Sequence, residues 1–215
     1  MRFADRIEAG RALAARLAHY ANRPDVVVLG LPRGGVPVAA EVARALAAPL
    51  DVLLVRKLGA PAQPELAIGA IAEDGVTLVN EDVLQGLGLG LDAIDRVIAD
   101  EQTELERRLR AYRGDRAAVS VVGRSAILVD DGLATGASMD AACQVVAARG
   151  ATRVIVAVPV AAQEACDRLR AIAHEVVAVS TPSPFWAVGA WYAHFQQTTD
   201  EEVVDALATA TRSAR

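Results

Sequence analysis

The sequence predicts an α/β protein with an open, mostly parallel, doubly wound sheet. Short apolar runs alternate along its 215 residues with amphipathic segments of helical length. The runs are continuously apolar, which is typical of parallel strands covered by helices on both faces. No linker or internal repeat interrupts the alternation, so we expect one domain over residues 1–215.

The first half of the chain supplies two of the buried strands. An amphipathic helix is expected over about residues 4–21 and ends before Pro24, and residues 26–30 form the first apolar strand. A glycine-containing turn then leads into a helix over about 36–48, and residues 51–55 form the second strand.

A different pattern follows the second strand. Gly59, Pro61 and Pro64 predict a mobile loop, and residues 68–80 alternate enough for a hairpin that turns at Asp74-Gly75. The apolar positions of the next segment mark one face of a long charged helix; they are Leu91, Ile94, Ile98, Leu105, Leu109 and Tyr112.

The second half of the chain repeats the strand–helix alternation. Strands are expected at 126–129, 154–158 and 175–179, with helices over about 137–149 and 161–173 between them. Five buried strands predict a core over about residues 24–180. We expect a small hood over its ligand-binding edge, built from the two chain ends (about 1–23 and 181–215) and the hairpin segment (about 58–80). Open sheets of this kind bind ligands at the carboxyl ends of their strands, where the winding reverses.

Composition excludes several classes of protein. The acidic balance, 27 acidic against 22 basic residues, disfavours a protein that coats nucleic acid. Cys143 and Cys166 lie far apart in aliphatic surroundings and are interpreted as buried small hydrophobic residues. Residues 176–199 carry no formal charge, but Pro182, Pro184 and Gly189 interrupt them, so we expect neither a spanning helix nor a membrane partner. The N-terminus has no apolar leader, which predicts a cytoplasmic protein.

The most informative segment follows the strand at 126–129. Two adjacent carboxylates, Asp130 and Asp131, precede a turn that carries two glycines and the hydroxyls of Thr135 and Ser138. Backbone amides and hydroxyls at a helix N-terminus form an anion cradle, and carboxylates accept hydrogen bonds from vicinal sugar hydroxyls. The combination points to a phosphorylated sugar, whereas an ordinary helix cap needs only one such side chain.

Residues 126–138 resemble the fingerprint of the type I phosphoribosyltransferase family, in the version found in adenine-type members. The resemblance implies that Asp130 and Asp131 hold the ribose hydroxyls of phosphoribosyl pyrophosphate (PRPP). It also implies a cradle for the 5′-phosphate, formed by Ala134, Thr135, Gly136, Ala137 and Ser138. Gly132 departs from the family, which usually has an aliphatic residue there.

Ala134 is a second departure from part of the family. Members that act on hypoxanthine and guanine carry an aspartate at this position, near the base. A methyl group cannot act as a general acid or base, so a 6-oxopurine acceptor is disfavoured.

Two further strand ends fit the resemblance. The turn after residues 26–30 offers Arg33, Gly34 and Gly35, which in the family would bind pyrophosphate, although many strand–helix turns look similar. Arg56 and Lys57 end the second strand, and a similar pair opens the mobile catalytic loop of orotate- and adenine-type members. Lys57 is the only lysine, whereas the sequence has 21 arginines. Its presence is either due to chance or reflects a site that requires a compact ammonium group rather than a planar guanidinium.

Candidates for contact with the acceptor come from an aromatic cluster and from the predicted loop. Five aromatic residues cluster in 185–195, and Phe185 and Trp186 are candidates for stacking on a flat ring. Packing of the cluster onto the core, or a dimer contact, is the alternative, and packing is favoured. Glu65 lies in the predicted loop and could contact the base or the ribose, although a solvated carboxylate is the favoured interpretation.

The resemblance implies an enzyme that transfers a phosphoribosyl group from PRPP to a nitrogenous, base-like acceptor and releases pyrophosphate. Mg²⁺ is the expected cofactor; it would be bound through the substrate and in part by Asp130 and Asp131. The expected assembly is a homodimer. Two alternatives stay open at this point: a non-catalytic sensor of PRPP or a nucleotide on the same fold, and another phosphosugar enzyme that uses the same cradle.

Overall fold

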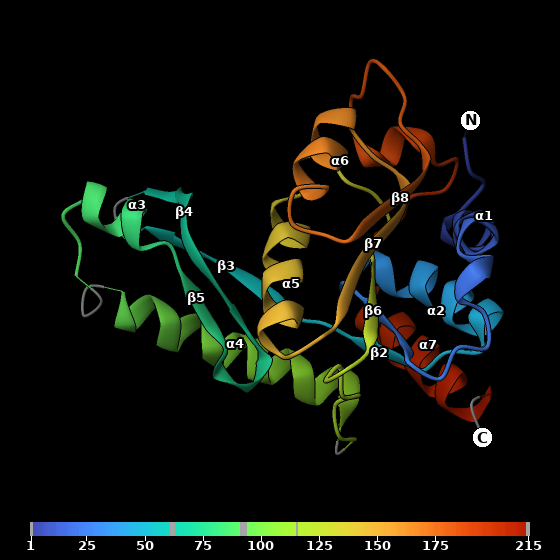
Figure 1. Cartoon of the computed structure of the whole chain (residues 1–215), viewed down its shortest axis with the longest axis horizontal. Coiled ribbons are helices and arrows are strands. Elements are labelled where there is room, and N and C mark those ends of the chain that lie inside the picture. The colour runs from blue at the N-terminus through green and yellow to red at the C-terminus, as the bar shows by residue number, and fades with distance from the viewer. Residues whose placement is uncertain (1, 61–62, 91–93, 115, 214–215) are drawn as a thin grey trace.

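The computed structural model describes residues 2–60, 63–90, 94–114 and 116–213 (Figure 1). Its central sheet has five parallel strands in the order β2 (Leu50–Val52), β1 (Val26–Gly30), β6 (Ser125–Val129), β7 (Arg153–Val160) and β8 (Glu175–Ser180). The predicted α/β fold with a mostly parallel sheet is therefore confirmed. The chain runs outward from β1 to β2 and returns on the other side of β1 as β6, so the winding reverses between β1 and β6.

Helices cover both faces of this sheet because successive residues of each strand point to opposite sides. Val26 and Val28 of β1 pack into one buried cluster, with α1 (Arg6–Arg16), α2 (Gly35–Leu46) and α7 (Asp200–Ser213). Val27 and Leu29 pack into the other, with α5 (Ala137–Ala148) and α6 (Gln163–Leu169). The alternation along one five-residue strand thus produces the double winding.

A second sheet projects from the first as an arm (Figure 1). It contains β3 (Val55–Ala60), β4 (Gln63–Ala72) and β5 (Thr77–Val79), all antiparallel, and it is flanked by α3 (Glu81–Gly86) and α4 (Asp95–Arg113). The predicted hairpin with its turn at Asp74-Gly75 is present between β4 and β5. We use "arm" for residues 55–113.

The predicted loop around residues 59–64 is wrong for its described part. Gly59 and Ala60 continue β3, which pairs with β4 from Val55↔Ala72 to Ala60↔Gln63 with irregular register around Gly59. Glycine and proline mark hairpin turns as well as long loops, so the signal that predicted a loop fits a hairpin equally well. Pro61 lies outside the described residues.

Buried charges join the arm to the core. Asp51 of β2 and Glu73, between β4 and β5, are only 5% and 2% exposed. Arg113, at the end of α4, contacts Asp51 Oδ2 at 3.1 Å and Glu73 Oε2 at 3.0 Å. Arg149, which follows α5, contacts Glu73 Oε1 at 2.9 Å. Each carboxylate is therefore compensated, as buried charges must be.

The N-terminal segment meets the segment after β8 on the side of the molecule opposite the arm (Figure 1). Phe3 N donates to Trp191 O at 2.8 Å, and Ala193 N donates to Phe3 O at 2.8 Å. The rings of Phe3 and Tyr192 pack 5.7 Å apart over Val160 at the end of β7. The segment after β8 thus folds back beside α1, while residues 58–80 lie in the arm. No helix in the described ranges is both long and apolar enough to cross a membrane.

Candidate active site

The site lies where the winding of the sheet reverses, at the carboxyl ends of β1 and β6. Leu31 N donates to Val129 O at 2.8 Å, so the loops that leave the two strands run side by side. The first loop carries Arg33, Gly34 and Gly35, and the second carries Asp130 and Asp131. Sequence positions almost a hundred residues apart are brought together here, as the fold class predicts.

The two glycines of the first loop are required by its contact with the second. A Cβ atom on Gly34 would lie 2.0 Å from Asp131 Oδ2, and one on Gly35 would lie 2.6 Å from Val129 O. The Pro32–Arg33 peptide bond is cis. No side chain fits between the loop and the acidic pair, so the backbone of 34–35 packs directly on the carboxylates.

The acidic pair is only partly open to solvent. Asp130 Oδ1 accepts a hydrogen bond from Asp131 N at 2.8 Å, which fixes the first carboxylate. Burial, and then the neighbouring charge of Asp131, raises the pKa of Asp130 well above its usual range. Burial also raises the pKa of Asp131, and Arg6 opposes that shift. Two carboxylates in one low-dielectric site need a cationic partner or bound ligand to stay ionised.

That partner is Arg6, in the first turn of α1. Its Nε and Nη2 atoms lie 2.9 and 2.8 Å from Asp131 Oδ2. On the other side of the loop, Tyr192 Oη donates to the backbone carbonyl of Asp131 at 2.6 Å. Neither contact could be recognised from the sequence, because the partners are 125 and 61 residues apart and neither Arg6 nor Tyr192 belongs to a motif.

The cradle predicted for a phosphate is formed by residues 134–138. Gly136 adopts φ 73°, and α5 begins directly after it. The first hydrogen bond at this helix end runs from Asp140 N to Gly136 O, so the preceding amides are free of intrahelical partners. Thr135 and Ser138 are exposed at the same end. Amides without intrahelical partners and two exposed hydroxyl residues thus meet at a helix N-terminus, where an anion is favoured.

The cradle also borders the arm. A cleft of about 560 Å³ separates Ala137 and Ser138 of α5 from Gly69, Leu78 and Asn80 of the arm. A ligand bound at the cradle would therefore lie close to the second sheet.

Comparison of this chain with known proteins identifies its family and several similar proteins. The chain matches the family of the phosphoribosyl transferase domain over residues 4–194. It belongs to the phosphoribosyltransferase family. The predicted membership is thus confirmed.

Two relatives are similar over nearly the whole chain. "Putative phosphoribosyl transferase Rv0571c" of Mycobacterium tuberculosis (strain ATCC 25618 / H37Rv) is 53% identical over 210 residues, which is 98% of this chain and 47% of that protein. The chain therefore spans about half the length of this curated relative. The crystal structure of TT1426 from Thermus thermophilus superposes with a TM-score of 0.89 at 49% identity, covering 97% of this chain and 99% of that one.

Arg33, the predicted pyrophosphate ligand of this phosphoribosyltransferase domain, lies near α7. Its Nη1 atom is 3.8 Å from Asp200 Oδ1, which also accepts a hydrogen bond from Tyr112 Oη at 2.6 Å. Burial and this bond raise the pKa of Tyr112 to about 12, so the phenol remains a donor. Arg33 is about a third exposed and lies beside the acidic pair's loop.

Arg56 and Lys57 occupy the start of β3. The Arg56 guanidinium forms an ion pair with Glu101 of α4, and that hydrogen bond raises the pKa of Arg56. No contact in the described part of the chain joins Arg56 to the Arg33 loop. The Lys57 backbone pairs with Ala70 in β4, whereas its side chain lies outside the described residues, as does that of Glu65.

The aromatic cluster divides into packed and exposed members. Tyr192 is 1% exposed and stacks 4.9 Å from Phe195, and Phe185 packs partly buried against the core. Trp186, in contrast, is 79% exposed. Packing, the favoured interpretation, therefore describes most of the cluster, and Trp186 is the one large ring of the five left open to solvent.

The remaining candidates have structural roles. Cys143 and Cys166 are 2% and 0% exposed, and burial raises the pKa of the Cys143 thiol to about 12. Both are buried small residues, as predicted. His174 Nδ1 accepts from Val154 N at 3.1 Å and so fixes the start of β7 and β8.

Proposed function

We propose that this domain transfers a 5-phosphoribosyl group from PRPP to a nitrogenous, base-like acceptor and releases pyrophosphate. One observation carries the proposal. The reversal point of the sheet brings together a carboxylate pair, an anion cradle at a helix N-terminus and a glycine-arginine loop that no side chain separates from the carboxylates. These three groups match the ribose hydroxyls, the 5′-phosphate and the pyrophosphate of one substrate.

The ribose would lie over Asp130 and Asp131. Its 5′-phosphate would receive hydrogen bonds from the amides of 134–138 and the hydroxyls of Thr135 and Ser138. Pyrophosphate would lie on the Gly34–Gly35 backbone near Arg33. The protein contributes mainly orientation and charge stabilisation to such a reaction.

In the reaction, the bond between the anomeric carbon and pyrophosphate breaks, and the electron pair leaves with pyrophosphate. The acceptor nitrogen donates its lone pair to the same carbon, and positive charge builds on the ribose between the two events. Two carboxylates close to that ribose stabilise the charge, provided that they are ionised. Arg33, and Arg56 and Lys57 if they reach the site, would stabilise the leaving pyrophosphate.

We propose Mg²⁺ as the cofactor because the carboxylate oxygens of the site fit this ion. Asp130 and Asp131 offer the oxygen ligands that this ion prefers, but the described residues hold no cluster of three or more ligating side chains. The pair would therefore hold the ion together with oxygens of the substrate. When bound, Mg²⁺ supplies Lewis-acid neutralisation of the pyrophosphate charge.

Trp186 is the proposed contact for the acceptor. Its exposed indole belongs to the segment after β8, which Tyr192 anchors to the Asp131 loop, and it offers a flat face on which a heteroaromatic ring can stack. Because the side chain is 79% exposed, Trp186→Ala should leave the melting temperature unchanged. It should raise the KM for the acceptor without changing the dissociation constant for PRPP.

Isothermal titration with PRPP and Mg²⁺ tests the proposal directly. We expect binding by the wild type and its loss in Asp130→Asn with Asp131→Asn. Absence of binding at millimolar ligand would refute the proposal. Pyrophosphate release with a panel of nitrogenous acceptors then separates an enzyme from a sensor, because a sensor binds PRPP without release.

A further inference from the structure

Arg6 occupies a position that the proposed reaction does not yet explain. Its Nε and Nη2 atoms both contact one oxygen of Asp131, Oδ2, at 2.9 and 2.8 Å. The two side chains are only 13% and 15% exposed. This fork places a planar cation directly beside a carboxylate that is expected to bind ribose.

The guanidinium is held on its other sides as well. Its third nitrogen, Nη1, donates to Gln196 O at 2.8 Å, and Cζ lies 4.1 Å from the centre of the Phe195 ring. Tyr192, which stacks on Phe195, binds the backbone of Asp131. Arg6 and its neighbours thus join the segment after β8 to the acidic pair.

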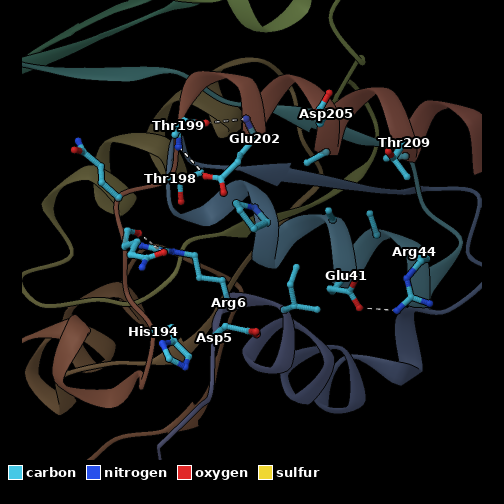
Figure 2. A pocket seen from close by; sticks show the side chains of 18 of the residues that line it. Asp5, Arg6, Glu41, Arg44, His194, Thr198, Thr199, Glu202, Asp205 and Thr209 are labelled. Atoms are coloured by element: carbon cyan, nitrogen blue, oxygen red, sulfur yellow. Dashed lines mark hydrogen bonds and ion pairs between the residues drawn. The ribbon is translucent and has the colours of Figure 1, made fainter.

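Arg6 is not simply part of a closed core. Figure 2 shows its side chain at the wall of a groove between α1, α2 and α7, close to His194 and Thr198. The groove has a volume of about 1010 Å³. An arginine that served only to fill space would not need to span from such a groove to a carboxylate at the site.

We propose that Arg6 is a positioning residue of the PRPP site: it fixes the Asp131 carboxylate through Oδ2 and leaves Oδ1, with Asp130, to accept the ribose hydroxyls. The inference rests on the proposed function. It assigns to the N-terminal helix a part in ribose binding that none of the sequence motifs carries.

Two physical effects support this role. A carboxylate held by a two-pronged donor loses its rotational freedom before the ligand arrives, so the ligand does not bear that entropic cost. One guanidinium beside two ionised carboxylates also cancels one of their two negative charges, which lessens the repulsion of an anionic substrate.

Arg6→Gln is the decisive variant, and Arg2→Gln is its matched control. Arg2 also joins the N-terminal segment to the hood, through bonds of 3.1 and 2.9 Å to Tyr192 O, but has no contact with Asp131. Titration calorimetry would compare PRPP, ribose 5-phosphate and pyrophosphate on both variants at about 0.15 M salt, where distant charges are screened.

We expect Arg6→Gln to weaken the binding of PRPP and of ribose 5-phosphate about tenfold or more, because a bond to a charged group is lost. Pyrophosphate should lose less affinity than ribose 5-phosphate, because it feels only the lost positive charge, and Arg2→Gln should change none of the three affinities. Arg6→Lys can reach Asp131 but cannot also donate to Gln196 and lie flat on Phe195. It should therefore recover part of the affinity.

Each other outcome overturns the inference. Unchanged PRPP affinity in Arg6→Gln would make Arg6 a structural tether, and tighter binding would make it a competitor for the ribose position. If Arg6→Gln does not fold, Arg6→Lys decides, because wild-type affinity in that variant contradicts the proposed role. If the wild type itself binds no PRPP, the proposed function fails and this inference fails with it. Wild-type binding with an unaffected Arg6→Gln refutes the inference alone.

Discussion

Replacement of Glu73 by glutamine should destabilise the domain strongly, although Glu73 lies outside the site. Its two carboxylate oxygens compensate Arg113 at 3.0 Å and Arg149 at 2.9 Å, and the three side chains are only 3–16% exposed. Arg113 keeps its contacts with Asp51 in the variant. The ion pair between Arg149 and Glu73 Oε1 is replaced by a contact with a neutral amide, whose nitrogen then faces one of the two guanidinium groups.

The size of the effect follows from burial. Removal of one partner from a buried ion pair costs about 3–5 kcal/mol. For a chain of about this length, each kcal/mol lowers the melting temperature by about 2–4 °C. We therefore expect Glu73→Gln to lower the melting temperature by at least about 6 °C, as measured by calorimetry or by circular dichroism.

Glu106→Gln is the matched control for this experiment. Glu106 pairs with Arg110 at 3.7 Å on the surface of α4, where the two side chains are 49% and 80% exposed. An exposed pair contributes about 0–1 kcal/mol, so this variant should melt close to the wild type. A wild-type melting temperature for Glu73→Gln, or equal losses in the two variants, would refute the burial argument.

Three further predictions concern the site. Gly34→Ala should lower the free energy of unfolding by about 1–3 kcal/mol and weaken PRPP binding, because the new Cβ atom would lie 2.0 Å from Asp131 Oδ2. Gly86→Ala is the control: its Cβ atom would meet no atom within 4 Å, so neither stability nor PRPP binding should change. Asp130→Asn should raise the melting temperature at neutral pH while it abolishes PRPP binding. The raised pKa of Asp130 means that its favourable contribution is complete below about pH 4 and is lost as pH rises through the folded pKa, so the gain should shrink on acidification. Lys57→Arg should reduce pyrophosphate release several-fold, and a wild-type rate would make the single lysine a coincidence.

The central sheet could be predicted from the sequence because its signals are local. Residues 26–30 and 126–129 are continuous apolar runs, and both appear as strands within one residue of the predicted bounds. The strand-end loops follow from those strands, since parallel strands place their carboxyl ends at one edge. The juxtaposition of Gly34 with Asp131 was therefore implied by the fold class.

The hairpin at Asp74-Gly75 was predicted from local signals, whereas strand β3 and the contacts of the hood could not be predicted in the same way. β3 contains Gly59 and an interrupted register, so no regular local pattern marks its pairing with β4, although Leu58 and Ile68 are both fully buried. The Arg6–Asp131 pair joins residues 125 positions apart. No sequence feature distinguishes Arg6, one of 21 arginines, from an arginine whose side chain is solvated.

The contacts between the N-terminal segment and the segment after β8 bear on the order in which the molecule assembles. Arg2 and Arg6 each reach a partner 190 residues away, at Tyr192 and Gln196. We expect contacts of such sequence separation to form late, because closing so long a loop is entropically costly until the intervening chain is ordered. During synthesis the last strand, β8, is complete at Ser180, before Gln196 leaves the ribosome. The nascent chain can thus possess its sheet while the carboxylate of Asp131 still lacks its arginine, and under the proposed role of Arg6 it would gain competence for the ligand only after the sheet is complete.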